Sequence, residues 1–138
     1  MRLSKAFATA VLLVTSSVVH AQDSELTLGA SAFGAHCALC HGDDGKGGGE
    51  IADLFKVPPS DLTKLSAEAD GRFPFVEVYY ILARGMEQLG HGDAEMPVWG
   101  DYFVADAQED RGVSPGDALS IAAGRIMSVT LYLESIQE

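Results

Sequence analysis

Residues 36–45 of the chain, HCALCHGDDG, decide how the rest of the sequence is interpreted. They contain both cysteines, Cys37 and Cys40, and a histidine, His41, directly after the second. Two cysteines at this spacing can form a disulfide, act as a redox dithiol, supply half of a zinc site or anchor a haem. Each of these gives a different protein, so the surrounding sequence must discriminate between them.

The first residues are typical of an export signal. Arg2 and Lys5 give a positively charged start, and an apolar run follows over residues 6–19. This run is shorter than the roughly 20 residues that a membrane-spanning helix needs. We therefore expect residues 1–21 to be a cleaved signal peptide, the alternative being an uncleaved anchor. Residues 22–138 then suffice for one domain.

The composition is strongly acidic. The chain has 20 Asp and Glu against 9 Lys and Arg, a formal net charge of −11. Removal of residues 1–21 would take away Arg2 and Lys5 but no acid, which makes the mature chain more negative still. Such a chain will not bind nucleic acid by neutralising phosphates. A partner attracted by its charge should present a basic surface, although most of the acids can also be a plain solvated surface.

Three of the four cysteine chemistries fit the sequence poorly. Exported chains often carry disulfides, but a bridge between Cys37 and Cys40 would constrain the unfolded chain little. A structural zinc site needs four protein ligands, and there is no second cysteine pair. A redox dithiol is expected in a β-α-β setting, whereas the residues around this pair are helical or rich in glycine.

Haem attachment fits the pattern. Cys-x-x-Cys-His is a signature of c-type haem attachment. On a helix, Cys37, Cys40 and His41 lie on one face, so that all three side chains can meet one flat ligand. The two thiols can add to the vinyl groups of haem b, and Nε2 of His41 can then bind the iron.

A second axial iron ligand should come from a distant loop. Met96 lies in residues 92–100, GDAEMPVWG, where Pro97 restricts the backbone and glycines flank the segment. We therefore expect Met96 to be this ligand. His36 is too close to the attachment site to reach the opposite haem face. The remaining candidates are Met86, His91 and Met127, the last of which we interpret as core filler.

The first half of the chain is predicted to contain three helices. Apolar residues at helical spacing predict a helix over residues 26–40. Residues 42–49 are rich in glycine and are expected to be irregular. A break at residues 58–61 precedes a short helix over residues 62–65. The apolar segment 73–84, which a glycine follows, predicts another helix, with a strand as the alternative.

The last helix has the clearest sequence signals. Ser114 is a suitable N-cap, Pro115 a suitable first residue, and Asp117 stands close to a capping-box position. Residues 85–110, before it, are predicted to be a long loop. The apolar face of this last helix is predicted to comprise Leu119, Ala122, Ile126, Val129 and Leu133.

At this point the chain resembles the class I c-type cytochromes, small monohaem electron carriers of the bacterial periplasm, over essentially its whole mature length. Cys37, Cys40 and His41 match the attachment motif, and residues 96–100, MPVWG, are similar to the methionine-ligand loop. The resemblance implies an all-α cytochrome c fold in which N- and C-terminal helices cross and loops enclose one haem c. It implies thioether bonds to Cys37 and Cys40 and axial ligation by His41 and Met96.

One loop matches the family pattern, and another departs from it. Residues 58–62 look like the proline loop of the family, which implies that the carbonyl of Pro58 or Pro59 accepts the Nδ1 proton of His41. Residues 101–116 form a longer acidic connection than the smallest members carry. We interpret it as a surface insertion rather than a docking feature.

The resemblance also predicts where the N- and C-terminal helices cross. The small residue Gly29 would let the last helix pass closely, with Val129 and Tyr132 packed near Phe33.

The implied function is that of a periplasmic electron carrier whose iron cycles between Fe(III) and Fe(II). We find no base–nucleophile constellation and predict that the chain is not an enzyme and has no small-molecule substrate. We expect a monomer whose redox partners present a basic docking surface. The alternatives are a cytochrome subunit of a redox enzyme complex and a haem-based sensor or small-ligand binder.

Overall fold

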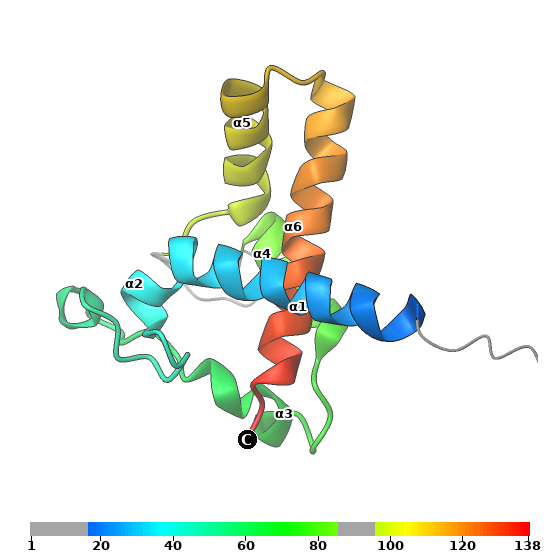
Figure 1. Cartoon of the computed structure of the whole chain (residues 1–138). Coiled ribbons are helices and arrows are strands. Elements are labelled where there is room, and N and C mark those ends of the chain that lie inside the picture. Colours follow the sequence, from blue (N-terminus) through cyan, green and yellow to red (C-terminus); the bar gives the residue numbers. More distant parts are fainter. Residues whose placement is uncertain (1–16, 86–95) are drawn as a thin grey trace, which may run out of the picture.

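The computed structural model describes residues 17–85 and 96–138 (Figure 1). The regular elements in these ranges are all α- or 3-10 helices, and no strand occurs among the described residues. This confirms the all-α class. The elements are α1 (Ser17–His36), α2 (Ala38–His41), η1 (Ala52–Leu54), η2 (Leu62–Lys64), α3 (Leu65–Glu68), α4 (Phe75–Arg84), α5 (Trp99–Arg111) and α6 (Pro115–Ser135).

Most of the predicted signal peptide lies outside the described residues, so its cleavage stays a prediction. Across the described ranges, no helix has the length and apolar character needed to cross a bilayer.

Helix α1 crosses α6 in close contact (Figure 1). A Cβ atom added at Gly29 would lie 2.1 Å from the backbone oxygen of Ser128, so only glycine permits this approach. One helical turn further along α1, Phe33 is 2% exposed, and its ring centroid lies 5.3 Å from that of Tyr132. The predicted crossing at Gly29 is therefore confirmed.

Helix α6 begins as its sequence predicts, and four of the five residues predicted for its apolar face are buried, Leu119 being the exception. The Ser114 hydroxyl accepts a hydrogen bond from Asp117 N at 3.2 Å. Leu119 is 62% exposed, whereas Ala118 is fully buried. Met127 is 40% exposed and is not core filler, contrary to our prediction. The most buried apolar residues of α6 are Ala118, Ala122, Ile126, Val129 and Leu133.

Segment 73–84 is a helix and not a strand. Helix α4 begins at Phe75, and its buried residues Val78 and Leu82 stand one turn apart. Gly85 ends it with φ 78°, donating its N–H to Ile81 O. This glycine adopts the backbone conformation that L side chains avoid.

The prediction of a loop over residues 85–110 is wrong from Trp99 onward, where helix α5 begins. Helix α5 also includes most of the segment 101–116, which is therefore not only a connection. It runs beside the first half of α6 (Figure 1). Its buried residues Phe103 and Ala107 are one turn apart, 3% and 0% exposed, and supply the apolar face that stabilises it. Gly112, in the left-handed conformation, ends it.

The crossing of α1 and α6 gives a first prediction. Gly29→Ala should destabilise the protein by about 1–3 kcal/mol, because the new methyl group pushes two packed backbones apart. Chemical denaturation followed by circular dichroism measures this.

The matched control is Gly34→Ala in the same helix, where nothing lies within 4 Å of the added Cβ. Its free energy of unfolding should stay equal or rise by up to about 1 kcal/mol, as the helix propensity of alanine predicts. Equal destabilisation by both variants would contradict the close crossing.

Candidate functional site

The two cysteines lie at the junction of α1 and α2. We predicted one helix over residues 26–40, but α1 ends at His36 and Cys37 separates it from α2. Backbone hydrogen bonds continue across the junction, from Cys37 N to Phe33 O at 2.8 Å and from His41 N to Cys37 O at 2.9 Å. Cys37 and His41 therefore keep the one-turn spacing that the motif requires.

The cysteines are free thiols in different environments. Cys37 is buried and Cys40 is half-buried. Burial, and to a smaller extent the negative charge of Cys40, raises the pKa of Cys37 to about 12. The attacking cysteine of a redox dithiol has a lowered pKa instead. The environment of Cys37 therefore does not suit dithiol exchange.

His41 is oriented by one hydrogen bond to the loop that precedes η2. Its Nδ1 lies 3.0 Å from the backbone carbonyl oxygen of Ser60. A carbonyl only accepts hydrogen bonds, so Nδ1 carries a proton, and in the neutral imidazole Nε2 then keeps its lone pair. The imidazole thus has the tautomer that a metal-binding histidine needs.

The carbonyl that accepts this bond belongs to Ser60, and our prediction of Pro58 or Pro59 is wrong. The Pro59 carbonyl is turned to the glycine-rich loop instead. A Cβ atom at Gly47 would lie 2.3 Å from Pro59 O. Because the two loops approach closely here, the Pro59 carbonyl faces Gly47. The next carbonyl, that of Ser60, is then the one that faces His41.

Asp61 holds the residues that follow Ser60. Its Oδ1 accepts hydrogen bonds from Thr63 N at 2.9 Å and from Thr63 Oγ1 at 2.6 Å. The hydrogen bond from the Thr63 side chain is the main cause that lowers the pKa of Asp61 below its usual 3.8. Asp61 therefore caps η2, the first part of the short helix predicted after the break at residues 58–61.

The glycine-rich loop over residues 42–49 wraps around His41. It is irregular, as predicted, and Gly47 has φ 86°. Gly47 N donates to His41 O at 2.7 Å, and Leu62 N donates to Gly45 O at 2.7 Å. The loop thus connects the histidine backbone to the segment that holds its side chain.

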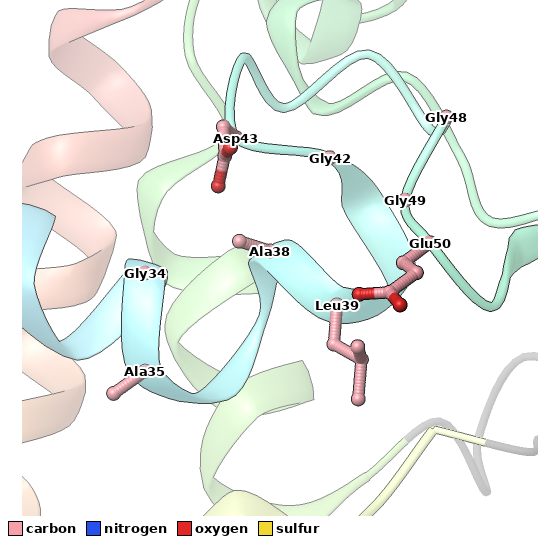
Figure 2. A pocket seen from close by; sticks show the side chains of 9 residues that line it. All are labelled: Gly34, Ala35, Ala38, Leu39, Gly42, Asp43, Gly48, Gly49 and Glu50. Carbon is pink, nitrogen blue, oxygen red and sulfur yellow. The ribbon is translucent and has the colours of Figure 1, made fainter.

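A hollow of about 420 Å³ lies between α1, α2 and the glycine-rich loop, with Asp43 and Glu50 at its rim (Figure 2). The residues that line it are Gly34, Ala35, Ala38, Leu39, Gly42, Asp43, Gly48, Gly49 and Glu50. None of Cys37, Cys40, His41 and Met96 is among them. The hollow therefore adjoins the motif through Ala38, Leu39 and Gly42 but is not lined by the predicted haem-binding side chains.

Met96 packs on the same apolar cluster as Cys37. It is half-buried, and it contacts the cluster of buried residues to which Cys37 belongs. Met86 and His91 lie outside the described residues. The choice of Met96 as second axial ligand therefore stays a prediction.

His36, excluded on sequence grounds as the second axial ligand, lies among aromatic rings of α5. Its ring centroid is 5.7 Å from that of Trp99, 5.4 Å from that of Tyr102 and 5.3 Å from that of Phe103. This packing fixes the start of α5, which follows Met96, beside the residue that precedes Cys37. The aromatic residues at 99, 102 and 103 were the available signal, and it was missed because this segment was predicted to be a loop.

Comparison with known proteins supports the c-type cytochrome class. The sequence is similar to that of "Cytochrome c6, chloroplastic" from Chlamydomonas reinhardtii, with 32% identity over 95 residues. The matched region is 67% of this chain and 54% of the relative, so the chain spans about half the length of that protein. No family model matches the sequence, and no solved structure matches it.

The cap at Asp61 gives a pH-dependent prediction. A carboxylate with a lowered folded pKa adds stability that is present above its unfolded pKa, near 4, and is lost as the pH falls through the folded value. Asp61→Asn should therefore be less stable than the wild type at pH 7, and the two should converge in acid.

Denaturation curves from pH 7 to pH 2 measure this difference. Asp53→Asn, an exposed acid on η1, makes the same change in charge and should follow the wild type throughout. A constant gap between Asp61→Asn and the wild type at every pH would contradict the cap.

Proposed function

We propose that the chain attaches one haem c covalently and carries electrons between protein partners. The hydrogen bond from His41 Nδ1 to Ser60 O is the observation that carries the proposal. It leaves Nε2 of the motif histidine free for iron, one turn from a buried cysteine thiol. The similarity to cytochrome c6 supports the same cofactor.

The residues present fit this group. Cys37 and Cys40 would hold it by thioether bonds, and His41 and Met96 would be the axial ligands. Haem supplies an iron that changes between Fe(III) and Fe(II). The Ser60 carbonyl fixes the imidazole ring and increases its basicity as a ligand. A thioether from Met96 would raise the reduction potential.

The partners we propose are proteins with a basic surface. The net charge of −11 would attract such partners and speed their approach. Complexes of this kind are small and transient. We propose further that the chain is exported to the periplasm, with residues 1–21 removed, that it acts as a monomer, and that it is not an enzyme.

Covalent attachment is tested by expressing the exported chain together with a haem-attachment system. The wild type should keep its haem on a denaturing gel, where non-covalent haem is lost. The Cys37→Ser, Cys40→Ser double variant should lose it. A wild-type chain without covalent haem would refute the proposed function.

The axial ligand is tested with two methionine variants. Oxidised wild type should show the weak absorption band of a methionine–iron bond, and Met96→Ala should lose it. Met127→Ala, at an exposed position of α6, is the matched control and should keep the band. Survival of the band in Met96→Ala would show that another residue binds the iron.

Carbon monoxide separates an electron carrier from a small-ligand binder. The reduced wild type should change its spectrum little when carbon monoxide is added, because both axial positions are occupied. Reduced Met96→Ala should bind it readily. Strong binding by the wild type would favour the sensor alternative.

A further inference from the structure

The two residues that follow Ile136 at the end of α6 join the loops around His41. The Glu138 carboxylate bridges two lysines, with Oε1 2.7 Å from Lys46 Nζ and Oε2 2.8 Å from Lys64 Nζ. Lys46 belongs to the glycine-rich loop and Lys64 to η2. Glu138 N also donates to Thr63 O at 3.0 Å. One residue thus ties together two segments that are separate in the sequence.

Gln137 adds three hydrogen bonds from its side-chain amide. Nε2 donates to Leu62 O at 2.8 Å and to Leu133 O at 2.7 Å, and Oε1 accepts from Ser66 N at 2.8 Å. The amide therefore fixes both ends of the segment over residues 62–66 to the last turn of α6. Its hydrogen-bonding groups are used on both the donor and the acceptor side.

These contacts lead directly to His41. Ser60, whose carbonyl accepts from the imidazole, lies two residues before Leu62, which Gln137 holds. Lys46, which Glu138 holds, directly precedes Gly47, whose N–H donates to His41 O. The end of the chain described here therefore restrains His41 on its side-chain side and on its backbone side.

The restraint matters because the Ser60 carbonyl accepts the Nδ1 hydrogen bond of His41. A hydrogen bond that a ligating histidine donates through Nδ1 increases the electron donation of the ring to the metal. The strength of that bond depends on where the carbonyl is held. Exposed ion pairs contribute little to overall stability, but a carboxylate shared by two lysines can still determine the position of a loop.

We propose that Gln137 and Glu138 are positioning residues that clamp the Ser60 carbonyl onto His41 and so set the electron donation of this ligand. The part that concerns the iron rests on the proposed function. The part that concerns the clamp does not.

The experiment uses two variants and one matched control. Gln137→Ala removes the three amide hydrogen bonds without a change in charge. Glu138→Gln removes the bridging carboxylate. Glu134→Gln makes the same change in charge on the last turn of α6, where the carboxylate is exposed and makes none of the contacts described above.

The first measurement is hydrogen exchange at the Gly47 and Leu62 amides, which donate to His41 O and Gly45 O. Exchange should become at least about fivefold faster in Gln137→Ala, because the net contribution of a single hydrogen bond already corresponds to that factor. It should also be faster in Glu138→Gln. It should stay at the wild-type rate in Glu134→Gln. Equal rates in all four proteins would overturn the clamp, whether or not the protein binds haem.

The second measurement is the reduction potential of the haem-loaded protein. A looser hydrogen bond weakens the donation that stabilises Fe(III), so the potential should shift upward in Gln137→Ala. In Glu138→Gln it should shift further than in Glu134→Gln. Faster exchange without these shifts would overturn the positioning role and leave a purely structural contact. Absence of haem from the wild type would refute the proposed function instead.

Discussion

The close crossing of α1 and α6 at Gly29 is the constraint on which the rest of the structure depends. From this point α1 continues through Phe33 to the residue before Cys37. Helix α6 continues from Ser128 to its last residue, Ser135, which Ile136 follows as the C-cap. Residues near the ends of both helices lie beside the glycine-rich loop. A Cβ atom at Gly45 would contact the side chain of Ile136 at 3.1 Å and that of Phe33 at 3.9 Å. One helix contact thus places the cysteine motif and the end of α6 around the same loop.

Features encoded by neighbouring residues could be predicted from the sequence. The cysteine motif, the cap of α6 at Ser114 and the stop of α4 at Gly85 each depend on a few adjacent residues. The crossing at Gly29 was predicted through the resemblance, which supplies information about distant contacts. Local chemistry and family pattern together therefore gave the class and the motif residues.

Features that depend on contacts between distant segments could not be predicted. Gly100 lies in the segment predicted to be a long loop, but a Cβ atom there would lie 2.2 Å from Ala83 O, so the glycine permits the contact of α5 with α4. Ser60 was missed because the choice of carbonyl follows from the contact between Pro59 and Gly47. In both cases the residue type reflects a backbone contact that no periodicity reveals.

Several of the few positive charges of the chain take part in internal contacts. Only 9 residues of the chain are Lys or Arg. Four of them have identified partners within the protein: Lys46 and Lys64 with Glu138, Arg125 with Asp106, and Arg84 over the Tyr80 ring. Internal contacts therefore use nearly half of the scarce positive charge. The acids far outnumber the cations of the chain, and this excess of negative charge agrees with the proposal that a partner attracted by charge presents a basic surface.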